Sequence, residues 1–309
     1  MVAVYMPENS SGKSLVFLGG YIVSSFPIYF YKQFVEMIGD STGRPVVCIQ
    51  YDDILGGAGT GFGNHRKSAE VALEACREMG LMEVDIVAHS LGCKIATIIR
   101  DEGLGGEDCK CVFVSPNNQD LDGSLDYTLG VLRKLGGSER AEEAERALGS
   151  LKMLIRGLGG KFFKFNPDRE AFWDIARRVF RINKGNLKII SLEGEGEEGL
   201  DEAFEWIMEI GKKARELSLE GVVDLEVQRG DETDETLVVS SKSSEGQGEN
   251  NSISVDVLDF PHLSPCYFDL TSQFNRASAT GFDSKFGKVG KLEMVEEIAK
   301  LVSEFIKQR

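Results

Sequence analysis

The chain is poor in histidine, in basic residues relative to acidic ones, and in long apolar runs. Only three of its 309 residues are histidine. No apolar run approaches the roughly 20 residues that a membrane-spanning helix needs, and residues 1–7 lack the basic start and the long apolar stretch of a secretory signal. We therefore expect a soluble protein that works inside a cell or an organelle and is not secreted.

The charge balance and the cysteines exclude further classes. The chain has 35 Lys and Arg against 50 Asp and Glu, a net charge of −15 that repels phosphate backbones, so we expect no nucleic-acid partner. The six cysteines lack C-x-x-C spacing and are expected to be reduced core residues. Cys109 and Cys111 share one face of an expected strand, but a metal site would need His or further Cys beside them. The glycines at 56–63 follow an expected strand but do not open directly into a helix with the G-x-G-x-x-G spacing of a dinucleotide site, so we expect neither a metal nor a cofactor.

Apolar runs and helical patterns alternate along the chain. The expected buried strands cover residues 14–20, 44–51, 84–89, 110–115 and 187–192. The run I-S-V-D-V-L-D-F at 253–260 alternates with period two and is expected to be an edge strand. The helical patterns cover residues 28–38, 64–79, 91 onward, 200–217 and 291–306, and Asn64 is expected to cap the second of these helices. Strands separated by helices predict a mostly parallel sheet covered on both faces, with all strand C-termini at one edge. Open α/β sheets hold their ligands at that edge.

One motif organises this arrangement, V-D-I-V-A-H-S-L-G-C-K at 84–94, in which Ser90 lies between a strand pattern and a helix pattern. Serine hydrolases place the nucleophile on such a strained turn in the pattern G-x-S-x-G, because only small side chains fit two residues before and after it. Here these positions hold Ala88 and Gly92. We predict that Ser90 is a nucleophile; the alternative is a tight turn in another kind of α/β protein.

A serine hydroxyl needs a neighbouring base, and the three histidines limit the choice. His89 belongs to the turn itself, and His65 lies at the start of an earlier helix pattern. His262 follows the last expected strand, in V-L-D-F-P-H-L-S-P-C, where a chain order of serine, acid and histidine places the base. We therefore predict that His262 activates Ser90.

The oxyanion of an acyl-transfer reaction needs two N–H donors. The amide of Leu91, directly after the nucleophile, is predicted to supply one. The loop L-G-G-Y after the first strand pattern is predicted to supply the other, from Gly20 or Tyr21, because glycine lets the backbone approach a ligand closely.

The acid of the triad has two candidate positions. Glu197 lies in the loop E-G-E-G-E-E-G between the strand pattern 187–192 and a helical pattern, as a parallel crossover requires. Asp231 and Asp234, in R-G-D-E-T-D-E-T, are the rivals, but no helical pattern follows them. We favour Glu197, and a solvated acidic loop without a catalytic role is the remaining alternative.

The rhythm of strands and helices is interrupted at 121–186 by helical segments and glycine hinges. We expect this stretch to be a helical lid inserted between two parts of one core, residues 1–120 and 187–309. Residues 230–251, rich in Ser, Gly, Asp and Glu, are expected to be a mobile excursion from the second part.

The lid includes a basic apolar piece, Leu151–Phe165, without acidic residues. Its charges are Lys152, Arg156, Lys161 and Lys164. Long basic side chains can lay their stems on apolar surface while the charge stays in water. The piece is either a plain amphipathic lid or one that contacts an anionic lipid surface or an anionic acyl substrate.

Five motifs carry a resemblance to a known family. They are F-L-G-G-Y at 17–21, N-H-R-K-S-A at 64–69, A-H-S-L-G-C-K at 88–94, S-P-N-N at 115–118 and H-L-S-P-C at 262–266. The chain resembles a family of uncharacterised α/β-hydrolase-like proteins of cyanobacteria, algae and plant plastids, well over its first 120 residues and thinly over its last 60. The resemblance implies the α/β-hydrolase fold, a cytoplasmic or plastid location, and matches Ser90 and His262 to the family's serine and histidine. This chain differs from the family at Ala88, where similar chains have glycine.

Two functions are consistent with these residues. The first is a serine hydrolase of the carboxylesterase or lipase type, which cleaves a small-molecule acyl ester or thioester, or a lipid, through an acyl-enzyme on Ser90. The alternative is a non-catalytic protein of the same fold that serves in binding or assembly, because a fold does not dictate a function.

Overall fold

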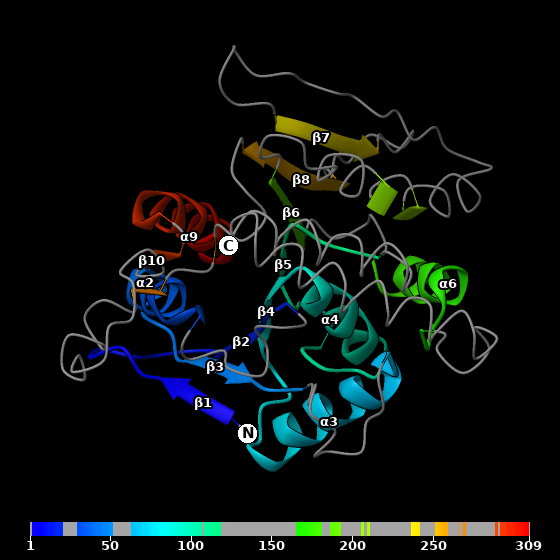
Figure 1. The fold of residues 1–309 in the computed structure, drawn as a ribbon, viewed down its shortest axis with the longest axis horizontal. Helices are drawn as coiled ribbons and strands as arrows, with labels where there is room; N and C mark the ends of the chain where they lie inside the picture. The colour runs from blue at the N-terminus through cyan, green and yellow to red at the C-terminus, as the bar shows by residue number, and fades with distance from the viewer. Residues whose placement is uncertain are drawn as a thin grey trace, which may run out of the picture.

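The computed structural model describes residues 2–20, 30–51, 63–106, 108–118, 165–180, 186–192, 205–206, 209–210, 236–241, 251–258, 265, 268–269, 288–289 and 291–308. Within these residues, a central sheet separates two layers of helices (Figure 1). No helix in this part of the chain is long and apolar enough to cross a lipid bilayer.

The central sheet of the described residues has eight strands in the order β1-β3-β2-β4-β5-β6-β8-β7. They are β1 Val2–Tyr5, β2 Leu15–Leu18, β3 Val46–Ile49, β4 Asp85–His89, β5 Cys111–Val114, β6 Leu187–Leu192, β7 Thr236–Ser241 and β8 Asn251–Leu258. The six inner strands are parallel, and the edge strands β1 and β7 run antiparallel to their neighbours. The predicted mostly parallel sheet is confirmed. Two short strands, β9 Phe268–Asp269 and β10 Lys288–Val289, pair separately.

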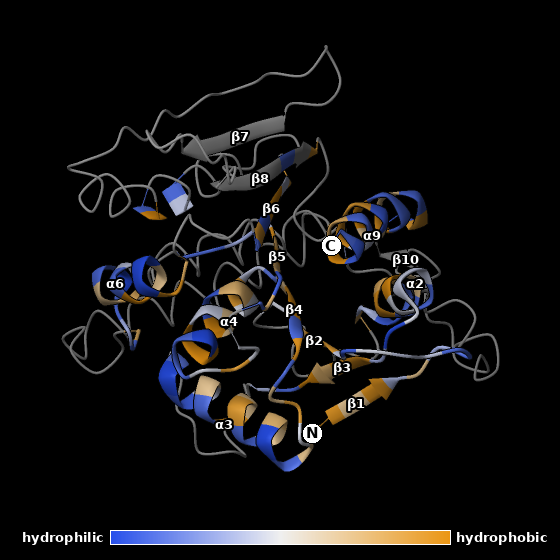
Figure 2. Cartoon of the chain, turned by 180° about the vertical axis from the view of Figure 1, so that it is seen from behind, coloured by the Kyte–Doolittle hydropathy of each residue, from blue (hydrophilic) through white to orange (hydrophobic). Residues whose placement is uncertain are grey.

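Helices cover both faces of this sheet, as predicted. On one face lie α2 Lys32–Thr42 and α9 Leu292–Lys307; on the other lie α3 His65–Glu78, α4 Leu91–Asp101 and α6 Arg169–Val179. In β2 the alternation is direct: Leu15 and Phe17 pack towards α2 and α9, and Val16 and Leu18 towards α3 and α4. The apolar sides of these helices face the sheet (Figure 2).

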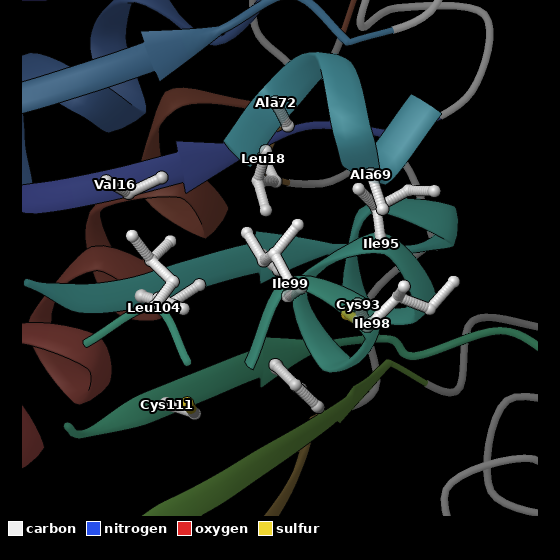
Figure 3. Packing of buried hydrophobic residues seen from close by; sticks show 14 of the residues in the cluster. Val16, Leu18, Ala69, Ala72, Cys93, Ile95, Ile98, Ile99, Leu104 and Cys111 are labelled. Atoms are coloured by element: carbon white, nitrogen blue, oxygen red, sulfur yellow. The ribbon is translucent and has the colours of Figure 1, made fainter. Parts of the chain in front are cut away.

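The layer of α3 and α4 forms a continuous apolar core against the strands. Figure 3 shows side chains of this core from three elements, which are Ile95 and Ile99 of α4, Ala72 of α3, and Val16 and Leu18 of β2. All five are fully buried. Burying an aliphatic side chain of this size contributes roughly 1.5–3 kcal/mol, so this layer holds α4, and with it the turn at Ser90, firmly on the sheet.

Local signals set several helix boundaries. The side chain of Asn64 accepts a hydrogen bond from the Lys67 amide at 3.3 Å and caps α3, as the sequence predicts. Asp168 caps α6 in the same way through the Ala171 amide at 3.0 Å. At its C-terminal end, α2 is capped by Gly43, which has the left-handed conformation that glycine adopts easily.

The structure differs from the prediction at the edges of the sheet. The run 253–260, expected as an edge strand, falls on the inner strand β8, because β7 pairs with its outer side. Strand β1, V-A-V-Y, is not anticipated by the sequence patterns, because it is half-exposed and pairs with β3 alone. Strand β7 lies inside residues 230–251, which we expected to be a mobile excursion. Its sequence T-L-V-V-S-S has β-branched residues that suit a strand, and it pairs with β8 along its whole length.

The structure describes only part of the predicted lid. Helix α6 falls in the stretch 121–186, yet Phe172, Trp173, Ile175 and Ala176 are buried in the same apolar cluster as α3, α4 and the sheet. This part of the expected insertion is therefore a layer of the core. Residues 121–164, with the basic lid piece except Phe165, lie outside the described residues.

Candidate active site

Ser90 forms the turn between β4 and α4. Its backbone has φ 55° and ψ −126°, a conformation that costs about 1–3 kcal/mol for a residue other than glycine. Among the described non-glycine residues, positive φ occurs only at Ser90 and Ser115. The Ser90 amide donates to the Val114 carbonyl at 3.0 Å, which ties the turn to β5. The predicted sequence of strand, strained turn and helix is thus present.

Gly92 lies in the first turn of α4, directly against the end of β2. A Cβ at this position would lie 2.2 Å from the carbonyl oxygen of Leu18 and 2.6 Å from that of Gly19. Such distances are too short for any side chain, so only glycine fits. Ala88, two residues before Ser90, is fully buried in β4 next to Leu18. Packing against β2 therefore requires the small residues of the A-x-S-x-G pattern.

The predicted oxyanion loop lies against Ser90. A Cβ at Gly20 would lie 3.2 Å from the Cβ of Ser90, so the backbone of this loop is in contact with the serine. The Gly20 amide donates to the hydroxyl oxygen of Tyr31 at 2.9 Å, and the Tyr51 hydroxyl donates to the Gly19 carbonyl. Two buried tyrosines thus hold the loop. Tyr21, the other predicted donor, lies outside the described residues.

His89 is joined to the same network. Its Nδ1 atom lies 2.7 Å from the hydroxyl oxygen of Tyr31, and the side chain is almost fully buried. A histidine held in this way is a structural partner of the loop and not a free base beside Ser90, in agreement with its exclusion from the predicted triad. Tyr31 and Tyr51 were missed in the sequence, because no motif marks a tyrosine that contacts a loop far away in the chain.

His65, the first residue of α3, and Lys94, in α4, form a second buried group. His65 packs on the ring of Phe165, with centroids 4.5 Å apart, and neither of its ring nitrogens has a hydrogen-bond partner among the described residues. The Lys94 ammonium lies 5.5 Å from the Phe165 ring centroid and 5.1 Å from that of Phe172. Burial, and secondarily the charge of Lys94, lowers the pKa of His65 well below its usual range. His65 is therefore a neutral residue enclosed by apolar groups.

Burial also lowers the pKa of Lys94 to about 7, against an opposing contribution from Asp168. Lys94 is 1% exposed, and desolvation of the ammonium outweighs the attraction of the carboxylate. No sequence pattern marks this lysine, because its position on a helix alone does not reveal that aromatic rings cover it.

The remaining predicted catalytic residues follow strands that end beside Ser90. His89 pairs with Val114 in the register of β4 and β5, and Leu192 pairs with Leu258 in that of β6 and β8. Because these strands are parallel, the chain leaves β4, β6 and β8 at the same edge of the sheet. His262 follows β8 in the sequence but lies outside the described residues.

The candidate acids also lie outside the described residues, and their neighbouring strands do not separate them. Glu197 follows β6, which ends at this edge. Asp231 and Asp234 precede β7, which begins opposite Asp256 near the end of β8 because the two strands are antiparallel. The chain therefore reaches the same edge next to both candidates. The choice of Glu197 stays a prediction, and the crossover argument that favoured it does not exclude its rivals.

The loop after β5 adds buried polar groups at this edge. Ser115 has φ 45°, and its amide donates to the Ile190 carbonyl at 2.7 Å. Asn118 is 3% exposed, and within the part of the chain that the structure describes neither atom of its side-chain amide has a hydrogen-bond partner. The described residues contain no group of three His, Cys, Asp or Glu side chains that could hold a metal ion.

Solved structures resemble this chain. An esterase of Pyrococcus furiosus has a TM-score of 0.51 at 14% identity, over 99% of this chain and 90% of that one. A proline iminopeptidase of Mycobacterium smegmatis has a TM-score of 0.41 at 15% identity, over 68% of this chain and 83% of that one. A carboxylesterase of the ammonia-oxidizing thaumarchaeon Nitrososphaera gargenis has a TM-score of 0.41 at 11% identity, over 69% and 82%. No family model and no curated protein sequence matches the chain.

The likeness to the Pyrococcus esterase extends over nearly the whole chain, and identity of 14% makes it evidence of fold alone. The narrower resemblance to a cyanobacterial, algal and plastid family stays a prediction. The sheet order, the helices on both faces and the strained serine between β4 and α4 agree with the likeness. The chain has the α/β-hydrolase fold.

Proposed function

We propose that the protein is a serine hydrolase that cleaves an ester or a thioester through an acyl-enzyme on Ser90. The observation that carries this proposal is the positive φ of Ser90 between β4 and α4, with the Gly20 backbone in contact with it. This turn raises a serine hydroxyl above the edge of a parallel sheet, where ligands bind. Esterases and a peptidase among the structures of similar fold support hydrolysis as the reaction class.

In the proposed reaction, the Ser90 hydroxyl oxygen attacks the carbonyl carbon of the substrate, and His262 takes the hydroxyl proton. The tetrahedral intermediate then expels the alcohol or thiol, which receives the proton from His262, and the acyl group stays on Ser90. Water attacks this acyl-enzyme with the help of the same histidine, and the carboxylic acid leaves.

His262 is proposed partly by elimination. His89 is bound to Tyr31, and His65 is enclosed beside Phe165 with a pKa far below the range of a base that works at neutral pH. Only His262 remains of the three histidines. We propose Glu197 as the acid that orients it, with Asp231 and Asp234 as the alternatives.

We propose that two backbone amides donate hydrogen bonds to the oxyanion. Leu91 begins α4, where the first N–H groups have no acceptor within the helix and the helix dipole favours negative charge. Of the two predicted loop donors, the Gly20 amide is engaged by the Tyr31 hydroxyl. The Tyr21 amide is therefore the proposed second donor.

The substrate class rests on charge. The basic residues Lys152, Arg156, Lys161 and Lys164 are expected to favour an anionic acyl substrate or an anionic lipid surface. A neutral short ester would not use them, so such an ester tests the chemistry without testing this preference.

Labelling with a fluorophosphonate probe tests the proposed nucleophile. We expect the wild-type protein to be labelled and Ser90→Ala to lose labelling completely, because the probe forms a covalent bond with an activated serine oxygen. Ser303→Ala is the matched control, since Ser303 is a buried serine of α9 on the core side. A folded wild-type protein that stays unlabelled would contradict the proposal and favour the non-catalytic binding protein.

Turnover of an activated ester tests the proposed base and compares the candidate acids. His262→Ala and Glu197→Gln should each lower kcat/KM by about 10²-fold or more, because both act on the proton of Ser90. Loss of turnover in Asp234→Asn with full activity in Glu197→Gln would assign the acid to the segment before β7 instead.

A further inference from the structure

The Tyr31 hydroxyl joins the two chain segments that meet at Ser90. Its oxygen accepts the Gly20 amide at 2.9 Å and exchanges a hydrogen bond with His89 Nδ1 at 2.7 Å. Gly20 lies in the loop after β2, and His89 is the last residue of β4, next to Ser90. A single oxygen atom therefore links the glycine loop after β2 to the end of the strand that precedes the serine.

The tyrosine ring is itself held in place. The ring is fully buried and contacts the Phe17 ring edge-on, with centroids 4.8 Å apart. Tyr31 is also the N-terminal cap residue of α2. A Cβ at Gly19 would lie 2.6 Å from its Cε2 atom, so the ring fits directly against the backbone of the loop. The ring cannot shift without moving β2 or α2, and its hydroxyl is a fixed point.

The second tyrosine acts on the neighbouring peptide. The Tyr51 hydroxyl donates to the Gly19 carbonyl, while Tyr31 binds the Gly20 amide. Since a carbonyl and the next amide belong to one planar peptide, both polar groups of the Gly19–Gly20 peptide are fixed. Glycine is the most mobile residue type, so this loop needs such contacts to stay in one orientation.

We infer that Tyr31 is a positioning residue of the proposed active site, which holds the Gly19–Gly20 peptide in register with Ser90 so that the loop is preorganised for the oxyanion. This inference rests on the proposed function. Preorganised backbone dipoles lower a transition state because they need not reorient when charge develops. Tyr31 touches neither substrate nor oxyanion in this role and acts through the loop.

Tyr31→Phe tests the inference, because it removes the hydroxyl and keeps the buried ring. We expect the rate of fluorophosphonate labelling and kcat for an activated ester to fall by about tenfold or more, with KM within about twofold, since the loss falls on the transition state. Hydrogen exchange should become faster in the peptide that contains Gly20. Tyr5→Phe is the matched control, because Tyr5 also donates its hydroxyl to one partner, Asp40, at the far edge of the sheet.

A pair of variants at His89 separates positioning from general stability. His89→Asn places an amide near the former position of Nδ1, so it should keep part of the wild-type labelling rate. His89→Phe leaves the Tyr31 hydroxyl without this partner and should be labelled as slowly as Tyr31→Phe. If Tyr31→Phe is labelled at the wild-type rate, or Gly20 exchange is unchanged, the inference is wrong and the proposed hydrolase stands. If the wild-type protein is not labelled, the proposed function and this inference fall together.

Discussion

Two groups of buried polar side chains lie on either side of Ser90, and they differ in how their polar atoms are satisfied. In the tyrosine group, Tyr31 is hydrogen-bonded to both Gly20 and His89. In the group of His65 and Lys94, both ring nitrogens of His65 lack a partner in the described parts of the chain, and Lys94 faces the rings of Phe165 and Phe172. The first arrangement fixes a geometry, and the second costs stability.

The difference follows from the energetics of burial. A buried polar group that is hydrogen-bonded recovers most of its desolvation cost, and connected groups hold one another in a single arrangement. A buried ionisable group without such partners shifts its pKa toward the neutral form, as His65 and Lys94 do. The tyrosine group should therefore control activity, and the His65 and Lys94 group should control how stability depends on pH.

Gly92→Ala should have the largest effect on stability and activity, because it disturbs the packing of α4 against the glycine loop that Tyr31 holds. A Cβ there would lie 2.2 Å from a backbone oxygen of β2, so α4 or the loop must move, at a cost of about 3 kcal/mol or more. Urea unfolding measures this loss, and labelling of Ser90 should fall with it. Gly12→Ala is the comparison: Gly12 has nothing within 4 Å, and its φ of 82° makes the added Cβ cost backbone strain alone, about 1–2 kcal/mol. Equal stability of the two variants would show that α4 is not held as closely as described.

Lys94→Met should raise stability at neutral pH by removing a buried charge. The folded-state pKa of Lys94 is about 7, below the ordinary 10.5, so between these values the unfolded chain binds more protons than the folded one. The free energy of unfolding of the wild type must therefore rise with pH across this window, by up to about 1.4 kcal/mol per pH unit. Below pH 7 the penalty is fully present.

The measurement is the difference in free energy of unfolding between Lys94→Met and the wild type at several pH values from 6 to 10. The variant should be the more stable protein by a constant amount up to about pH 7, and the difference should then shrink as pH rises. A difference that does not change with pH would show that Lys94 does not titrate in this window, and would remove the contrast between the two groups.

His65→Leu should have the smallest effect at pH 7, because His65 is already neutral there. Its folded-state pKa lies well below the usual 6.5, so the wild type should lose stability as pH falls below about 6.5, where the unfolded histidine takes up a proton. The variant should lack this loss. Thermal unfolding at pH 7 and pH 5 checks it, and an equal drop in Tm for both proteins would assign the acid sensitivity to other groups.

The inner strands and the helices with clear signals could be predicted from the sequence, because their signals are local. Residues 187–192 were predicted as a strand with the bounds that β6 has, and Asn64 was predicted to cap the helix that it caps. Edge strands were harder. The β1 sequence is short and half-exposed, and β7 lies among small polar residues, so neither has a strong apolar pattern.

The candidate site could be predicted only as far as its motif. The pattern around Ser90 specifies a turn, because Ala88 and Gly92 are small at the positions that the turn requires. The contacts of Tyr31 with His89 and of Lys94 with Phe165 join residues that are far apart in the chain. No period or spacing encodes such pairs, since they depend on which faces of β2, β4 and the helices meet.

The sequence by itself determined the alternation of strands and helices, the turn at Ser90 and the scarcity of histidine that limits the candidate bases. These are properties of neighbouring residues, and short-range sterics and hydrophobic periodicity are sufficient to produce them. Only the tertiary structure decided that α6 belongs to the core, that both acid candidates adjoin strands at the Ser90 edge, and that one polar group is paired while the other is not. Those outcomes depend on long-range packing, because burial and hydrogen-bond partners exist only after the strands have found their order.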